Sequence, residues 1–129
     1  MLNRILLIED EALIRYFLEN RLKKENYNVD IAKDGKEAAR KISENKYSLI
    51  ISDLMLPFIS GFDLISKIRL DDKNSDTPIL VLSALSSENT IVEALSIGAS
   101  DFIPKPFAVD VLLAKVKYLF HPETSLKAS

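Results

Sequence analysis

Short apolar segments recur along this chain and alternate with longer segments in which apolar residues are more widely spaced. Residues 4–8 (RILLI), 49–52 (LIIS) and 79–82 (ILVL) are dominated by isoleucine, leucine and valine. Such runs are typical of strands buried on both faces of a sheet. Residues 29–31 alternate between apolar and polar, which favours a half-exposed edge strand, and residues 101–103 predict a short fifth strand.

The longer segments have apolar residues three and four positions apart, as an amphipathic helix requires. This spacing predicts helices over residues 11–25, 36–45, 62–70, 86 or 87–97, and 109–120. Asp34 and either Ser86 or Ser87 are expected N-caps, and Gly98 suits the left-handed position after the fourth helix. Strands that alternate with helices predict an α/β fold with a parallel sheet and right-handed crossovers.

Composition narrows the class of protein further. The chain has 129 residues, the usual size of one domain, and a net charge of −2. Without cysteine it forms no disulfide, thiolate metal site or thiol nucleophile. No basic face is indicated, so we expect no direct nucleic-acid binding. The apolar run before Glu9 is too short for a signal peptide or a membrane span, so we expect a cytoplasmic protein without a membrane partner.

Polar residues stand at or just past the ends of four predicted strands. They are Glu9 and Asp10 after the first, Asp53 after the third, Ser83 after the fourth and Lys105 after the fifth. The carboxyl ends of parallel strands share one edge of the sheet, so these groups can meet in one cleft. With strand order 2-1-3-4-5, the three carboxylates would be crowded together.

Three close carboxylates repel one another unless a cation lies between them. Oxygen ligands alone favour a hard cation such as Mg²⁺, which keeps several waters. A lysine and a serine beside such a metal suggest phosphate chemistry, because both donate hydrogen bonds to phosphoryl oxygens.

Each of these residues also has a simpler interpretation. Asp53 and Ser83 could have no role beyond binding loop amides. Asp10 could be the N-cap of the first helix, and Lys105 could be an ordinary solvated lysine. Met55 could be an apolar loop residue without a role. Their joint placement at strand ends is what favours a functional site.

Taken together, these motifs resemble the receiver domain of two-component response regulators. The matching residues are Glu9-Asp10, the DLMLP…G run from Asp53 to Gly61, Ser83-Ala84, Phe102 and Lys105-Pro106-Phe107. The resemblance implies a flavodoxin-like (βα)5 three-layer sandwich of strand order 2-1-3-4-5. The resemblance covers about residues 2–120. We therefore expect residues 1–121 to form one receiver domain, and residues 122–129 to be a polar tail or the start of a linker.

The resemblance also implies a role for each residue. Asp53 would accept the phosphoryl group, Lys105 would contact it, and Ser83 and Phe102 would switch inward. Mg²⁺, for which Mn²⁺ can substitute, would be held by Asp10, Asp53 and the Met55 backbone carbonyl, with Glu9 acting through water. The Lys105–Pro106 bond would be cis. Departures from the family pattern are small: Glu9, Ser83 and Phe102 stand where Asp, Thr and Tyr are frequent.

The resemblance further implies partners. A sensor histidine kinase or phosphotransfer protein would dock on a surface that includes Ile14, Phe17, Pro106 and Phe107, and a downstream output domain or protein would receive the signal. The chain would then be a signalling switch and not an enzyme in the ordinary sense, catalysing its own phosphorylation. Because Met55 and Leu85 flank the approach of water and are both apolar, we expect slow autodephosphorylation.

Two other classes fit the sequence less well. A metal-dependent phosphohydrolase would need a general acid, commonly an Asp, two residues after Asp53, where Met55 stands. A flavin or nucleotide carrier would need a Gly-, Ser- or Thr-rich phosphate loop after the first strand, where the chain has Glu9-Asp10-Glu11.

Overall fold

The structure of the chain, a computed structural model, describes residues 3–120. Its strands are β1 (Arg4–Ile8), β2 (Asn28–Ala32), β3 (Leu49–Ser52), β4 (Ile79–Ser83) and β5 (Asp101–Pro104). All are parallel and lie in the order β2-β1-β3-β4-β5, which confirms the predicted fold class. Residue 121 and the expected tail, residues 122–129, lie outside the described part of the chain.

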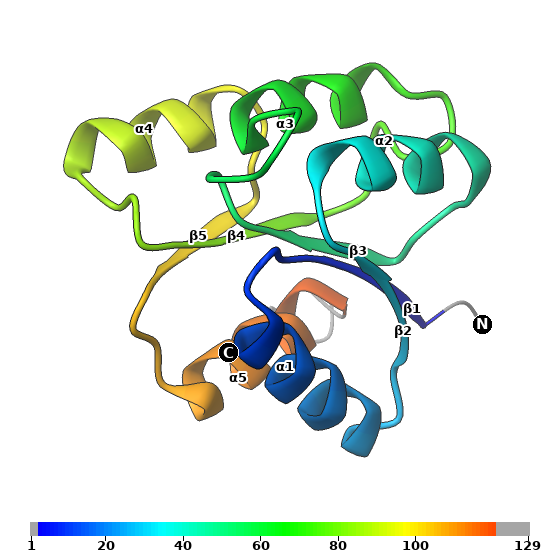
Figure 1. The fold of residues 1–129 in the computed structure, drawn as a ribbon, viewed down its shortest axis with the longest axis vertical. Helices are drawn as coiled ribbons and strands as arrows, with labels where there is room; N and C mark the ends of the chain where they lie inside the picture. Colours follow the sequence, from blue (N-terminus) through cyan, green and yellow to red (C-terminus); the bar gives the residue numbers. More distant parts are fainter. Residues whose placement is uncertain (1–2, 121–129) are drawn as a thin grey trace.

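The helices cover both faces of this sheet, giving three layers (Figure 1). On one face lie α2 (Gly35–Glu44), α3 (Gly61–Leu70) and α4 (Glu88–Ser96), and on the other lie α1 (Ala12–Lys24) and α5 (Val109–Phe120). The observed helices begin and end within two residues of the predicted bounds.

The apolar runs of the strands supply two cores, one on each face of the sheet. In β1, Leu6 and Ile8 belong to the core beneath α2, α3 and α4, whereas Ile5 and Leu7 belong to the core beneath α1 and α5. This is the two-residue period of a strand, and a slip by one residue would exchange the two sets. Each such buried side chain contributes roughly 1.5–3 kcal/mol by leaving water.

Side-chain caps set the starts of three helices. Asp34 accepts a hydrogen bond from the Glu37 amide, and Ser87 accepts one from the Thr90 amide. Of the two serines expected to cap α4, Ser87 is therefore the one that does so. The third cap is Ser60 at the start of α3, which sequence analysis did not predict.

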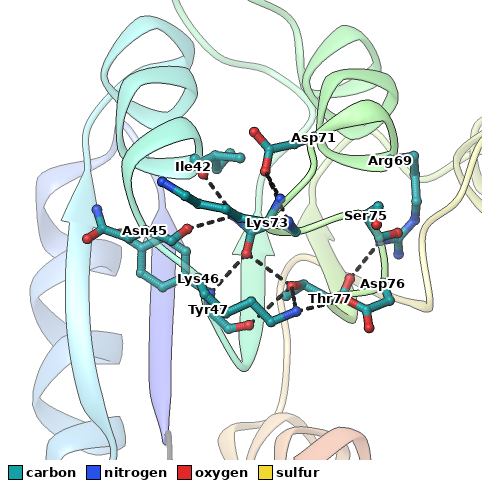
Figure 2. Close-up of polar contacts among 11 residues, drawn as sticks. Ile42, Asn45, Lys46, Tyr47, Arg69, Asp71, Lys73, Ser75, Asp76 and Thr77 are labelled. Carbon is teal, nitrogen blue, oxygen red and sulfur yellow. Dashed lines mark hydrogen bonds and ion pairs between the residues drawn. The ribbon is translucent and has the colours of Figure 1, made fainter.

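A buried polar network holds the amino-terminal edge of the sheet. The side chain of Asn74 donates to the carbonyl oxygens of Ile42 (2.8 Å) and Asn45 (2.7 Å) and accepts from the Tyr47 amide (2.9 Å). Figure 2 shows these backbone groups together with Thr77, whose hydroxyl lies 3.0 Å from Asn74 Oδ1. Because the buried polar groups find partners within the network, the α3–β4 loop is tied to α2.

Gly61 keeps the β3–α3 loop close to the end of β3. A Cβ atom on Gly61 would lie 2.4 Å from both the Asp53 carbonyl oxygen and Leu54 Cα, closer than any real contact. The Gly61 amide donates to the Leu54 carbonyl oxygen at 2.9 Å. The start of α3 therefore packs directly on the backbone that carries Asp53.

Phe58, in the same loop, has an unfavourable backbone conformation. Its φ of 72° lies in the left-handed region, and its side chain is 80% exposed, so little packing compensates. We expect Phe58→Asn to raise the free energy of unfolding by about 1 kcal/mol, because asparagine tolerates this conformation. The chain already places Asn26 there, with a φ of 68°. Urea unfolding measures the change, and Phe58→Ala is the control: an equal gain from alanine would mean that backbone conformation is not the cause.

Candidate functional site

The carboxyl-terminal edge of the sheet brings three carboxylates together. Glu9 and Asp10 follow β1, and Asp53 follows the neighbouring strand β3. One carboxylate oxygen from each lies within 4.8 Å of the other two. Glu9 and Asp53 are buried, whereas Asp10 is exposed. The cluster is therefore shielded from solvent on the side of Glu9 and Asp53 and open to solvent on the side of Asp10.

Lys105 supplies a positive charge to this cluster from the loop that follows β5. Its ammonium group donates to Glu9 Oε1 at 2.8 Å and to Asp53 Oδ2 at 2.9 Å. The Lys105 side chain is itself largely buried, and its amide donates to the Ser83 carbonyl oxygen. The Lys105–Pro106 peptide bond is cis, as predicted.

Burial and charge act against each other in this ion pair. Burial raises the pKa of Glu9, and the Lys105 ammonium offsets only part of this effect. For Lys105, burial would lower the pKa, but the hydrogen bonds to Glu9 and Asp53 outweigh it and the pKa is raised. The lysine thus stays charged, and it can serve as a fixed counter-charge beside Asp53.

Both oxygens of Asp53 are held by hydrogen-bond donors. Oδ1 accepts from the amides of Leu54 (2.6 Å) and Met55 (3.1 Å) and from the Ser83 hydroxyl (2.6 Å), while Oδ2 accepts from Lys105. The interpretation of Asp53 as a binder of loop amides is therefore correct but incomplete. The carboxylate is oriented by four donors from three segments of the chain, an arrangement that leaves its direction little freedom.

Asp10 does not cap α1, so that alternative is wrong. The N-cap position is Glu11, and the Glu11 amide is bound instead by Glu9 Oε2 at 3.1 Å. Arg15, which the sequence did not single out, donates from Nη1 to the backbone carbonyl oxygens of Glu9 and Asp10. These contacts hold the acidic loop and leave the Asp10 carboxylate facing the cluster.

The donor set fits a hard divalent cation. Three carboxylates face one lysine, so the cluster carries excess negative charge that a cation would relieve. The Met55 carbonyl oxygen accepts no hydrogen bond from the rest of residues 3–120, which leaves it available as a ligand. Oxygen ligands with an exposed side suit Mg²⁺, which retains waters.

Ser83 and Phe102 both face inward in the structure. The Ser83 hydroxyl donates to Asp53, and it also accepts from the Leu85 amide at 3.2 Å. Phe102 is 7% exposed and packs in the core beneath α2, α3 and α4. The fold therefore accommodates the inward positions that the resemblance implied for these two residues.

A groove of about 420 Å³ lies beside Lys105. Its walls come from α1 and from the β4–α4 and β5–α5 loops, and they comprise Glu11, Ile14, Ala84, Lys105, Pro106 and Phe107. Three of the four residues expected on a partner surface therefore line it. Phe17 does not, but it is exposed on α1 together with Leu13 and Tyr16.

The chain is an α/β sandwich with an acidic cluster, a lysine and a serine at the carboxyl ends of its strands, an arrangement suited to phosphate chemistry. Comparison with known proteins gives the family. The family described as "Response regulator receiver domain" matches residues 5–117. The chain belongs to this family. Within residues 3–120, no helix is long and apolar enough to cross a membrane.

Individual relatives agree with this assignment. The response regulator ArlR of Staphylococcus saprophyticus is 42% identical over 116 residues, which cover 90% of this chain and 51% of the relative. The chain thus spans about half the length of the curated relatives it matches.

Solved structures with the same fold include two receiver domains. That of the Francisella response regulator 1452 has a TM-score of 0.87 at 32% identity, covering 94% of this chain and 98% of its own. That of the Pseudomonas aeruginosa sensor kinase PA1611 has a TM-score of 0.85 at 27% identity, covering 93% and 98%, and holds a magnesium ion in its active-site cleft.

Proposed function

We propose that this chain accepts a phosphoryl group on Asp53 from a sensor histidine kinase or phosphotransfer protein, in a Mg²⁺-dependent reaction. The observation that carries the proposal is the placement of Asp53. It is a buried carboxylate at the carboxyl end of the central strand β3, oriented by Ser83 and Lys105. One of its oxygens lies within 4.8 Å of oxygens of two further carboxylates. A structural aspartate needs no such acidic neighbours, whose repulsion destabilises the fold.

The transfer itself needs little from the protein besides position and charge. A carboxylate oxygen of Asp53 attacks phosphorus, the bond from phosphorus to the donor breaks, and an acyl phosphate is formed. Lys105 neutralises charge on the phosphoryl oxygens, and the amides of Leu54 and Met55 keep the carboxylate in place. The chain is therefore a signalling switch that catalyses its own phosphorylation.

A bound Mg²⁺ would supply further positive charge for the phosphoryl oxygens. Asp10, Asp53 and the Met55 carbonyl would hold it, and Glu9 would act through a bound water. Glu9 suits this indirect part because its carboxylate already binds Lys105 and the Glu11 amide. Mn²⁺ can take the same oxygen ligands.

Phosphorylation would act on the outer helices through Ser83. Its hydroxyl now bonds to Asp53, and a phosphoryl oxygen would offer a new acceptor. Phe102 packs behind it without a hydroxyl of its own, so its contribution would be steric. The phosphoryl group would stabilise the inward positions of both residues and so regulate an output domain or a partner protein.

Incubation with acetyl phosphate, followed by intact mass spectrometry, tests this proposal. The expected product carries one phosphoryl group when Mg²⁺ is present, and none when the metal is removed by a chelator. Adding Mg²⁺ back should restore the product. Equal phosphorylation with and without the metal would contradict the metal-dependent mechanism, and no phosphorylation under any condition would contradict the function.

The kinase is expected to dock across α1 and the groove beside Lys105. Phe17→Gln should slow phosphoryl transfer from a histidine kinase that phosphorylates the wild type, by about tenfold if the side chain is a hot spot. Acetyl phosphate should label this variant normally. The matched control is Tyr118→Gln on α5, since Tyr118 (45%) and Phe17 (46%) are almost equally exposed. Loss of labelling by both donors would indicate misfolding instead.

The phosphoryl group is expected to be long-lived. Met55 is 59% exposed beside Asp53, and Leu85 is exposed in the β4–α4 loop, so apolar surface flanks the approach of water. Met55→Asn should speed loss of phosphate by about tenfold, which corresponds to ~1.4 kcal/mol of barrier for one positioned water. Decay of labelled protein after donor removal measures this. A wild-type half-life of seconds, unchanged in the variant, would show that these side chains do not control water access.

A further inference from the structure

Arg69 binds the carboxyl-terminal end of α4 from a neighbouring helix. It lies in the last turn of α3 and donates from Nε (2.9 Å) and Nη2 (2.7 Å) to the carbonyl oxygen of Gly98, just past α4. Its Nη1 donates to the carbonyl oxygens of Ser75 (3.1 Å) and Thr77 (2.7 Å). Figure 2 shows Arg69 beside these two residues of the α3–β4 loop.

This arginine is used for its hydrogen bonds and not for a salt bridge. No carboxylate within residues 3–120 lies in ion-pair distance of it, and its four hydrogen bonds go to three backbone carbonyls. α4 has no basic residue in its own last turn, so Arg69 supplies the positive charge that favours a helix carboxyl terminus. Only a rigid guanidinium can reach all three carbonyls at once.

The contact with Arg69 requires glycine at position 98. Its φ of 128° requires glycine, and a Cβ atom there would lie 2.8 Å from Arg69 Cγ and 2.9 Å from Nε. The amides of Gly98 and Ala99 return to the carbonyls of Leu95 and Ala94, closing the last turn of α4. The Ser100 amide then binds Ile79, at the start of β4. This end of the helix is therefore tied to both α3 and the sheet.

The opposite end of α4 is held much less firmly. The helix buries only Ala94, and residues 88–92 include no buried residue. In the loop before the helix, the Leu85 amide donates to the Ser83 hydroxyl. The amino-terminal end is thus attached to the residue that faces the phosphoryl site, and among residues 88–92 only the half-buried Ile91 packs its apolar side chain on the core.

From this asymmetry we infer that Arg69 is a positioning residue that holds a pivot: α4 turns about its Arg69-bound carboxyl end when its amino end follows Ser83. The inference rests on the proposed function, because it needs phosphorylation of Asp53 to draw the Ser83 hydroxyl toward a new acceptor. The inference specifies which part of the switch moves on phosphorylation: residues 84–92 move, and residues 96–100 stay in place.

Amide hydrogen exchange followed by mass spectrometry tests the pivot in two stages. Without phosphorylation, Arg69→Met should speed exchange of the amides of residues 97–100 by at least about tenfold, since bonds to a charged donor are lost. Exchange in β1 and β3 should stay slow, which shows that the variant is folded. Arg69→Lys keeps the positive charge but lacks the planar guanidinium that binds several carbonyls, so it should give an intermediate increase in exchange at residues 97–100. The control is Arg40→Met, which removes an exposed arginine that pairs with Glu44.

With acetyl phosphate and Mg²⁺, exchange in the wild type should change over residues 84–92 and not over residues 96–100. In Arg69→Met the change should spread along the whole helix. Unchanged exchange at residues 97–100 in a folded Arg69→Met protein would overturn the inference. So would a phosphorylation-dependent change of equal size at both ends of wild-type α4. A wild-type chain that takes no phosphoryl group would instead defeat the proposed function, and the pivot with it.

Discussion

Asp53→Asn should abolish phosphorylation by acetyl phosphate, because a carboxamide is not a competent nucleophile toward phosphorus. The substitution is close to isosteric. Its amide oxygen can still accept from the Leu54 and Met55 amides and from Ser83, so the fold should survive. Intact mass spectrometry in the presence of Mg²⁺ measures the product directly.

The matched control is Asp63→Asn, an exposed aspartate in the first turn of α3. It should be phosphorylated like the wild type. Undiminished phosphorylation of a folded Asp53→Asn protein would mean that another group accepts the phosphoryl group, and the assignment of Asp53 would be wrong.

Lys105→Met should lower the free energy of unfolding by about 3–5 kcal/mol in the absence of metal. Removing Lys105 leaves Glu9 and Asp53 buried without their counter-charge, and breaking a buried pair costs more than the pair itself contributes. Urea unfolding with and without Mg²⁺ measures the effect. Mg²⁺ should stabilise this variant more than the wild type, because the cation then neutralises charge that Lys105 no longer offsets.

The loss of unfolding free energy in Lys105→Met should also depend on pH. The pKa of Glu9 is already raised by burial, and the lysine that partly counteracts this is missing in the variant. A carboxylate with a raised folded-state pKa destabilises the fold fully at pH values above that pKa, and the penalty declines as the pH falls below it and is gone below the lower pKa of the unfolded chain. The deficit of Lys105→Met should therefore shrink on acidification.

Lys115→Met is the control for these unfolding experiments. Lys115 pairs with Asp101 where both side chains are more than a third exposed, so its removal should cost less than about 1 kcal/mol. If the two lysine variants lost the same stability, burial of the Lys105 pair would not be what makes it important.

Most of the fold could be predicted because it depends on local patterns. The unbroken apolar runs of β1, β3 and β4 indicated that these strands are central, and the alternation in β2 indicated that it lies at one edge of the sheet. Asp34 was recognisable as a cap because a favoured residue precedes a helical pattern. The same rule failed at Asp10, because Glu9 satisfies the Glu11 amide from a position that the rule does not consider.

The gathering of Glu9, Asp10, Asp53, Ser83 and Lys105 could also be predicted, since it needs only that parallel strands end at one edge. Contacts made by long side chains could not. Nothing in the sequence indicates that Arg69 reaches Gly98, because that contact joins residues far apart in the chain through a turn of specific backbone conformation. The inward position of Phe102 was implied only by the family resemblance and not by any local pattern, because it depends on packing in the core beneath α2, α3 and α4.

Chemical mapping of the phosphorylated residue tests the central claim most directly. Borohydride reduces an acyl phosphate of aspartate to homoserine, and tandem mass spectrometry of the digested protein then locates the altered residue. After incubation with acetyl phosphate and Mg²⁺, homoserine should appear at position 53 and nowhere else, and the chelator-treated sample should contain none. Homoserine at position 10 or at another aspartate, with Asp53 intact, would contradict the account.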